Sequence, residues 1–365
     1  MNEHKPYIPP LLPPKLDYSE LITSIGDARE EIGNLSGSLL HPVVNPQLLV
    51  TPLLTKEAVV SSSIEGTIAT LEQVFRYEVE NTSLENEELR RDAQEIINYR
   101  KALEESLSQL DKRAIGENLL KKAHFILLNS VRGSRKDRGN FRKEIVFIGK
   151  LGAQIADASF IPAPPEKIPE LFKNWEKYIN SKKEKDPLVQ IAVAHYQFEA
   201  IHPFLDGNGR IGRLIIPLFL CDRKMLRYPI LYISEYFEEN RSDYINALHA
   251  VDVDGDWNTW IKFFLLGLNT QALRTQESVL KIINLYNELK ESVQKMGSVY
   301  GIPMLDFIFS RPIVNYPVLK SNLEASPQTV YNLLSKFEDK GILVEISDQK
   351  RNRIYIFRDL FGILK

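Results

Sequence analysis

Apolar residues recur every three or four positions through most of the chain, which predicts a protein built mainly from α-helices. Before them, the proline-rich first sixteen residues are expected to lie extended on the surface. A polar loop is predicted over 78–88, and an amphipathic helix over 187–201. The other expected helices lie over 17–40, 46–64 and 115–131, around Ile96 and Tyr99, around Trp175 and Tyr178, and from 213 to about 296.

One short segment interrupts this helical pattern in the middle of the chain. Residues 145–148 are typical of a strand, and residues 159–161 of its returning partner. The pattern therefore predicts a helical core that carries one β-hairpin.

The C-terminal segment has a different pattern. Short helices are predicted over 303–309 and 318–323, and Ser326 is expected to cap a longer helix that ends before Gly341. Two strands, over 342–347 and 353–357, follow it and enclose a basic turn. Two helices joined by a turn and followed by a hairpin predict a winged helix.

The composition narrows the protein class. A chain of 365 residues with 44% hydrophobic and 26% charged residues is expected to form two or three globular domains. The formal net charge of -2 carries no bulk signature of nucleic-acid or membrane binding. The single cysteine, Cys221, excludes an intrachain disulfide. Because we find neither a signal peptide nor an apolar run long enough to span a bilayer, we expect a cytoplasmic protein.

The segment His202–Arg213 contains the candidate catalytic and anion-binding residues. Its glycine-rich turn leads into an apolar helix, and such a turn presents unpaired backbone N–H groups to an anion. Arg210 and Arg213 lie three residues apart in the first helical turn, where a cation opposes the helix dipole unless a polyanion is bound. Asp206 can bind Mg²⁺ beside phosphates, and His202 is a base that titrates near neutral pH.

This segment, HPFLDGNGRIGR, resembles the defining motif of the Fic (Fido) family, HPFxDGNGRxxR, and matches it at every specified position. Upstream, Ser61, Glu65 and Gly66 resemble the inhibitory motif of Fic proteins that carry it N-terminally. The N-terminal YIPPLLPP and the predicted winged helix fit the same subgroup, so the resemblance covers almost the whole chain.

The resemblance implies a mainly α fold: a Fic-type helical core with a β-hairpin flap, an N-terminal helical inhibitory region and a C-terminal winged-helix domain. The expected divisions are 1–100, 101–295 and 296–365. It also implies a protein adenylyltransferase that transfers AMP from Mg-ATP to a Ser, Thr or Tyr hydroxyl of a target protein, or of the enzyme itself, and releases pyrophosphate. A homodimer is expected, and no membrane partner.

The resemblance also implies a role for each motif residue. His202 removes the hydroxyl proton, Asp206 holds Mg²⁺, Arg210 binds the β-phosphate and Arg213 the γ-phosphate. The cradle around the phosphates consists of Gly207, Asn208 and Gly209, with Gly212 beside it.

Three further assignments concern regulation and substrates. Glu65 would pair with Arg213 and so occupy the γ-phosphate site. Phe147 and Ile148 would belong to the flap, which aligns a target segment by strand addition. Tyr244 would lie near adenine, with simple packing as the alternative.

Several alternatives stay open from the residues. His195, Glu199 and His202 share one helix face, which would also suit a metal hydrolase. Within the family, members that remove AMP or transfer another phosphate group are known.

A DNA-binding regulator is the alternative from another class of protein. Its phosphate contacts would come from Lys350, Arg351 and Arg353 on the wing.

Overall fold

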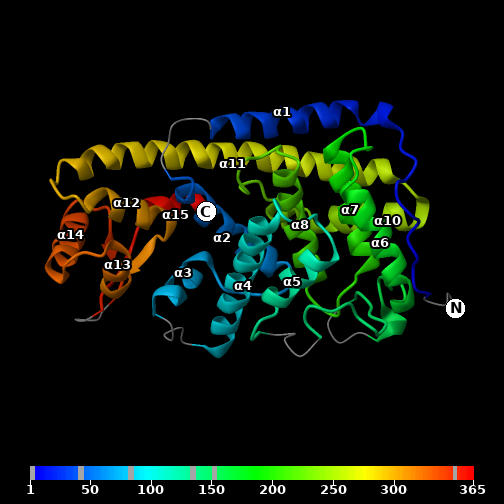
Figure 1. Ribbon diagram of the computed structural model, residues 1–365, viewed down its shortest axis with the longest axis horizontal. Helices are drawn as coiled ribbons and strands as arrows, with labels where there is room; N and C mark the ends of the chain where they lie inside the picture. The colour runs from blue at the N-terminus through cyan, green and yellow to red at the C-terminus, as the bar shows by residue number, and fades with distance from the viewer. Residues whose placement is uncertain (1–4, 40–44, 81–85, 132–136, 150–153, 348–351) are drawn as a thin grey trace.

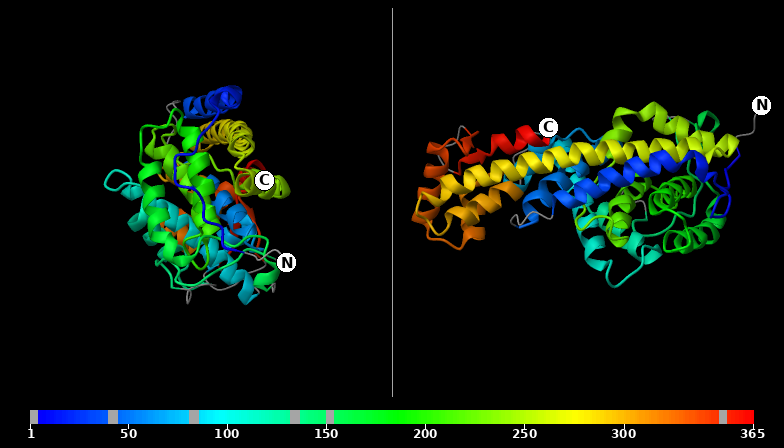
Figure 2. Two further views of the ribbon diagram at one scale, coloured as in Figure 1. Left: turned by 90° about the vertical axis from the view of Figure 1, so that its right-hand side faces the viewer. Right: turned by 90° about the horizontal axis from the view of Figure 1, so that it is seen from above.

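The computed structural model describes residues 5–39, 45–80, 86–131, 137–149, 154–347 and 352–365. Within these ranges the chain is mainly helical, as predicted. The longest helix, α11 (Trp257–Gln294), runs along the length of the molecule, and α1 (Ile22–Ser38) packs beside it (Figure 1, Figure 2). The C-terminal elements gather at one end of the molecule, and the helices α4 to α8 form the body below α11 (Figure 1).

The N-terminal part begins with an extended arm, as expected. The arm lies on the body, where the Leu12 N–H donates to Asn174 Oδ1 at 2.8 Å. The elements that follow are the 3₁₀ turn η1 (Tyr18–Glu20), α1, α2 (Gln47–Ser63), α3 (Leu71–Glu80) and α4 (Glu87–Gln109).

The loop predicted over 78–88 is wrong at both ends. Helix α3 continues to Glu80 and α4 begins at Glu87, while residues 81–85 lie outside the described ranges. The prediction overlooked a capping box at the start of α3. Thr70 Oγ1 accepts from the Gln73 N–H at 3.3 Å, and Gln73 Oε1 accepts from the Thr70 N–H at 2.8 Å.

Helix α7 (Pro187–Ile201) forms the centre of the body. Asp186 caps it by accepting from the Leu188 N–H at 2.7 Å. The prediction of an amphipathic helix is wrong here, because every residue from 188 to 198 is buried. A helix that is buried on all sides is a rigid support, and the motif begins at its last turn. Around it lie α5 (Glu117–Leu127), η2 (Ile155–Asp157), η3 (Pro165–Lys167), α6 (Ile168–Ile179), α8 (Asn208–Asp222), α9 (Ser234–Glu239) and α10 (Arg241–Asp254).

The predicted hairpin is reduced to a single bridge in the described residues. The Ile148 N–H donates to the Phe160 carbonyl at 2.8 Å, and the Ser159 N–H donates to the Ile148 carbonyl at 2.8 Å. The expected strand over 145–148 is absent from the described ranges, and residues 150–153 lie outside them. The Glu144 carbonyl, just before this segment, accepts from the Arg142 side chain at 2.8 Å.

The C-terminal elements have the order expected for a winged helix. They are α12 (Gly301–Ser310), β1 (Ile313–Asn315), α13 (Tyr316–Leu323), α14 (Pro327–Asp339), β2 (Val344–Glu345), β3 (Ile354–Ile356) and α15 (Arg358–Leu364), and the antiparallel sheet has the order β1-β3-β2. Ser326 caps α14, and Gly341 ends it with a φ of 70°. Strand β1 and helix α15 were not predicted.

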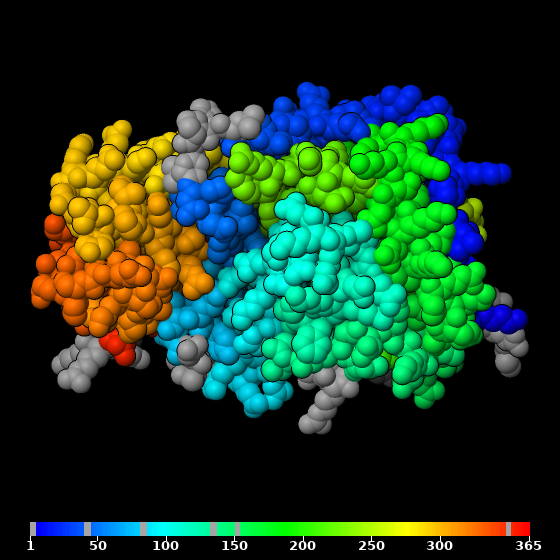
Figure 3. Space-filling view, viewed as in Figure 1, coloured from blue at the N-terminus to red at the C-terminus, as the bar shows by residue number. Residues whose placement is uncertain are grey.

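The surface is continuous from the N-terminal helices to the C-terminal elements (Figure 3). The expected division at residue 295 falls at the end of α11, whereas the one at residue 100 falls inside α4. Over the ranges that the structure describes, no helix is both long and apolar enough to cross a membrane.

Candidate active site

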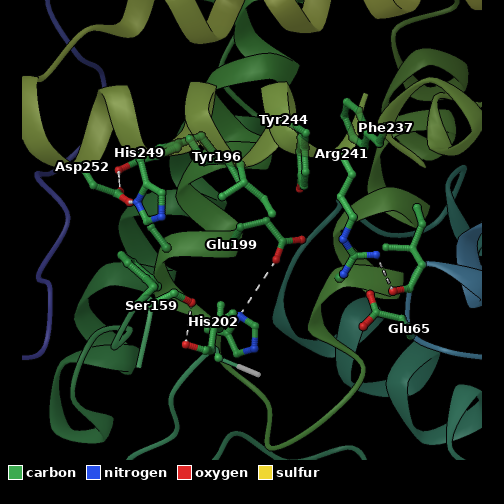
Figure 4. A pocket seen from close by; sticks show the side chains of 18 of the residues that line it. Glu65, Ser159, Tyr196, Glu199, His202, Phe237, Arg241, Tyr244, His249 and Asp252 are labelled. Atoms are coloured by element: carbon green, nitrogen blue, oxygen red, sulfur yellow. Dashed lines mark hydrogen bonds and ion pairs between the residues drawn. The ribbon is translucent and has the colours of Figure 1, made fainter. Parts of the chain in front are cut away.

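A pocket of about 400 Å³ opens where α7 passes into α8. Helix α10, the end of α2 and the hairpin complete its walls (Figure 4). Its lining includes residues from all of these elements: Glu65, Ile148, Glu199, His202, Arg213 and Tyr244. The structure therefore brings together segments that are distant in the sequence.

His202 ends helix α7 in a left-handed conformation, with φ 51°. Its Nδ1 lies 3.9 Å from Glu199 Oε2, and its side chain is 19% exposed (Figure 4). Burial and the nearby Arg142 charge lower the pKa of His202 to about 4, against an opposing effect of Glu65. The imidazole is therefore neutral at pH 7, as a base must be.

The turn between the two helices is held by side chains. Asn208 Oδ1 accepts from the Phe204 N–H at 2.8 Å, and Asn208 Nδ2 donates to the Phe204 carbonyl at 2.8 Å. Gly207 has a φ of 76°, which favours glycine. His124 Nδ1 accepts from the Gly139 N–H at 2.8 Å, so its Nε2 carries the proton and donates to the Asp206 carbonyl at 2.9 Å.

Arg210 is buried and faces two carboxylates. Its Nη1 lies 3.1 Å from Glu95 Oε2, a buried side chain of α4. Its Nη2 lies 3.7 Å from Asp206 Oδ1, in a carboxylate that is 29% exposed. Glu95 was not predicted as a site residue, because nothing in the spacing of α4 relates it to the motif.

Arg213 is bound by the segment that resembles an inhibitory motif. Its Nε donates to Ser61 Oγ at 2.8 Å, and its Nη2 donates to the Ser61 carbonyl at 2.7 Å and to Glu65 Oε1 at 2.8 Å. Although burial alone would raise the pKa of Glu65, the charge and hydrogen bond of Arg213 outweigh it, so this pKa is lowered. The carboxylate of Glu65 is therefore ionised at neutral pH.

Glycines allow this close approach. A Cβ atom on Gly209 would collide with Glu65 Oε1, and one on Gly212 would collide with Glu199 Oε1. Gly66 has a φ of 98°, and the Thr67 N–H donates back to the Ser62 carbonyl at 3.2 Å. This glycine closes the turn that follows α2, directly after Glu65.

The opposite wall is aromatic. Tyr244 stacks on Phe237 with ring centroids 4.3 Å apart, and its hydroxyl lies 3.2 Å from His195 Nε2. The buried His195 also contacts the Gly212 carbonyl through Nδ1 at 3.2 Å. Both ring nitrogens of His195 are therefore engaged, which argues against the metal-hydrolase alternative. In agreement, no group of three His, Cys, Asp or Glu side chains suited to a metal occurs among the residues with described positions.

The hairpin contributes Phe147 and Ile148 to the pocket, and these side chains are 38% and 41% exposed. The structure thus places both predicted flap residues at the site. On the winged helix, Arg353 lies 3.2 Å from Glu345, and Lys350 and Arg351 lie outside the described ranges.

Two contacts at the end of α2 were also missed. Arg241 Nη1 donates to the Ile64 carbonyl at 3.2 Å (Figure 4), and Ser63 Oγ donates to Glu238 Oε1 at 2.7 Å. Arg241 and Glu238 come from the region of α9 and α10, so sequence spacing offered no signal for them. These two hydrogen bonds connect the turn that carries Glu65 to α9 and α10, at the edge of the pocket.

The chain is similar to known proteins in both sequence and fold. The profile of the Fic/DOC family matches residues 114–220, and that of the Fic/DOC family N-terminal region matches residues 22–108. A probable protein adenylyltransferase of Aquifex aeolicus is 27% identical over 50% of this chain and 54% of its own length, so the chain spans about half of that relative.

Two solved structures share the fold. A Fic family protein from Desulfovibrio desulfuricans is 22% identical, with a TM-score of 0.58 over 95% of this chain and 98% of its own. Fic-1 from C. elegans is 19% identical, with a TM-score of 0.56 over 74% of this chain and 75% of its own. With both family profiles matched and the motif intact in the pocket, the chain belongs to the Fic/DOC family.

Proposed function

We propose that this protein is a protein adenylyltransferase, which transfers AMP from ATP to a Ser, Thr or Tyr hydroxyl of a target protein. The names of its curated relatives support this activity. The observation that carries the proposal is the Glu65 carboxylate, which is seated on Arg213 at the N-terminus of α8. This carboxylate is an anion that lies where the motif would hold a phosphate.

His202 is the proposed base. Its neutral imidazole accepts the hydroxyl proton as the target oxygen attacks the α-phosphorus of ATP. The bond from the α-phosphorus to the bridging oxygen breaks, and its electron pair leaves with pyrophosphate. Nε2 is the proposed accepting nitrogen, because Nδ1 lies on the side of Glu199, 3.9 Å from its Oε2.

The phosphates would be held by the turn and by the two arginines. The backbone N–H groups of Gly207, Asn208 and Gly209 belong to the first turn of α8, where they have no helical partner. Arg210 and Arg213 supply positive charge that stabilises the transferring group and the leaving group. Tyr244 and Phe237 offer an aromatic wall for the base of the nucleotide.

A divalent cation fits beside this turn, and Mg²⁺ is the proposed ion. Asp206 is a partly exposed carboxylate at the start of the turn, and Mg²⁺ needs only one or two carboxylates when phosphates supply other ligands. When bound, the ion would neutralise charge that develops on pyrophosphate.

We also propose that Glu65 inhibits the enzyme. Its carboxylate bonds to the guanidinium that would bind the γ-phosphate, and Ser61 holds the same guanidinium through two further hydrogen bonds. ATP would then bind without its γ-phosphate in place, so the α-phosphorus would be misaligned for attack.

The test uses ATP labelled at the α-phosphate or at the γ-phosphate, incubated with cell lysate and the Glu65→Gly variant. Adenylyl transfer predicts protein labelling from the α-label alone, with a mass increase of one AMP. Labelling from the γ-label would instead indicate phosphate transfer, and loss of a preformed AMP group would indicate removal. The double variant Glu65→Gly with His202→Ala is the matched control and is expected to be inactive.

Homodimer formation and DNA contact through the winged helix stay sequence-based predictions. Light scattering of the purified chain tests the first. Salt-dependent binding to duplex DNA tests the second, since phosphate contacts weaken as salt rises.

A further inference from the structure

Arg142 lies at the base of the hairpin and is only 3% exposed. Its guanidinium donates to the His202 carbonyl through Nε at 2.7 Å and to the Glu144 carbonyl through Nη1 at 2.8 Å. Nη2 donates to the Ile201 carbonyl at 3.2 Å and also to the Ala163 carbonyl. The Arg142 N–H donates to the Pro203 carbonyl at 2.9 Å.

These acceptors belong to three separate segments. Ile201, His202 and Pro203 end α7, Glu144 lies on the outgoing limb of the hairpin, and Ala163 follows its returning limb. Carbonyls at a helix C-terminus have no partner within the helix, and a cation there is favoured by the helix dipole. A planar fork of five donors can bridge such a set of carbonyls, which a lysine ammonium cannot.

The backbone of His202 needs such support. A φ of 51° is strained for a residue other than glycine, and such a conformation persists only where the surroundings hold it. The bonds from Arg142 to the carbonyls on either side of this residue hold the strained turn. Arg142 therefore holds the backbone from which the imidazole of His202 projects.

We propose that Arg142 is a positioning residue for the transfer reaction. It joins both limbs of the hairpin to the backbone of His202, so that the base and the target segment on the hairpin keep a fixed relative position. The proposal rests on the proposed function above. None of the roles assigned to the motif includes this residue.

Arg142 also acts on the imidazole by charge. The charged groups that face His202 are Arg142, Glu65, Glu199 and Asp206. The cation lowers the pKa of His202, whereas Glu65 and Asp206 raise it. Removing the cation is therefore expected to raise the pKa of His202.

The test compares Arg142→Met, Arg142→Lys and a control, Arg138→Met. Arg138 lies in the same segment, where its Nη1 donates to Asn129 Oδ1 at 2.7 Å and its guanidinium lies over the Phe125 ring. Three quantities are measured: kcat and KM for ATP in the Glu65→Gly background, the His202 pKa by NMR, and hydrogen exchange of the peptides around Ile148 and Ala163.

We expect kcat to fall by about 10- to 100-fold in Arg142→Met and Arg142→Lys with KM for ATP unchanged, because a misplaced base costs turnover and not phosphate binding. Hydrogen exchange of the two hairpin peptides should increase in both. The His202 pKa should rise in Arg142→Met and stay in place in Arg142→Lys, which keeps the charge but lacks the fork. Arg138→Met should match its background in all three.

Unchanged kcat in either folded variant, or faster exchange spread evenly over the whole chain, would overturn the proposal. If Arg142→Met does not fold, Arg142→Lys decides alone through kcat and the hairpin peptides. If the Glu65→Gly background itself transfers no AMP, the proposed function has failed. In that case the NMR and exchange measurements still decide whether Arg142 couples the hairpin to His202.

Discussion

The Glu65 carboxylate and the Arg213 guanidinium meet at 2.8 Å, although 148 residues separate them in the sequence. Each is placed against its own helix dipole, since Glu65 follows the end of α2 and Arg213 lies near the start of α8. Pairing removes both conflicts at once. A polyphosphate would remove only the conflict at Arg213, so the proposed inhibitory segment and a nucleotide would compete for one cation.

This competition predicts that Glu65→Gly raises the rate of AMP transfer by about tenfold or more. A tenfold gain corresponds to a barrier lower by about 1.4 kcal/mol. The gain should depend on Arg213, because without its side chain nothing is released. A cycle of parent, Glu65→Gly, Arg213→Ala and the double variant, assayed at saturating ATP, measures the coupling. Equal activity of Glu65→Gly and the parent would remove the inhibitory role.

Metal dependence is the second prediction. Asp206→Ala should lose most of its activity in the Glu65→Gly background, because charge on the leaving pyrophosphate would not be neutralised. EDTA should have the same effect on the unsubstituted site, and added Mg²⁺ should reverse it. Full turnover in EDTA would contradict the proposed role of Asp206.

The hairpin gives a third prediction. Ile148→Pro removes the N–H that donates to Phe160 at 2.8 Å, so it should strongly lower target modification. Lys143→Ser changes only an exposed side chain and should be mild. Both are measured with a fixed protein target, and automodification is followed separately. Similar losses in the two variants would argue against recognition through the backbone.

Much of this site was predictable because its residues lie in one short segment. The spacing of His202, Asp206, Arg210 and Arg213 indicates an anion cradle without any tertiary information. Gly66 likewise marks the end of a helix by its residue type alone. Local signals of this kind survive in the sequence because backbone conformation and neighbouring side chains determine them.

The residues that were missed act over long distances in the chain. Glu95 and Arg142 reach the motif from α4 and from the hairpin base, and no local periodicity relates them to it. The predicted hairpin was more regular than the observed one, whose described limbs are joined by a single bridge. The burial of α7 was missed since Gln190 and Gln197 look solvent-facing by type but are enclosed.

The pH dependence of stability provides a fourth prediction. Burial lowers the pKa of His195 from 6.5 to about 3. Between these two pH values the unfolded state therefore binds more protons than the folded state. His195 therefore contributes a loss of stability as pH falls below about 6.5. Glu57 and Glu199 oppose this trend, because burial raises the pKa of each to about 7. The test is thus a difference: urea unfolding of parent and His195→Gln should show a stability gap that narrows from pH 7 to pH 5. A gap that is constant with pH would contradict the buried neutral imidazole.

The last prediction concerns the buried pair of Glu95 and Arg210, in which both side chains are 4% exposed. Removing one member of such a pair leaves an uncompensated charge, which typically costs about 3–5 kcal/mol. Glu95→Ala should therefore lower the free energy of unfolding by about that amount. The matched control is Glu87→Ala on the same helix, where Glu87 pairs with Arg91 at the exposed surface. This control should lose no more than about 0.5 kcal/mol.

The effect of Mg-ATP on the melting temperature then shows whether the Glu95–Arg210 pair is only structural or also contributes to nucleotide binding. In Glu95→Ala, Arg210 loses its buried partner and keeps the partly exposed Asp206 carboxylate at 3.7 Å, so a bound polyphosphate should compensate its charge more than in the parent. Saturating Mg-ATP should raise the melting temperature of Glu95→Ala more than that of the parent, and in Glu87→Ala by the same amount as in the parent. Equal shifts in all three proteins would mean that Arg210 does not contact the nucleotide, and that its place in the motif serves the fold alone.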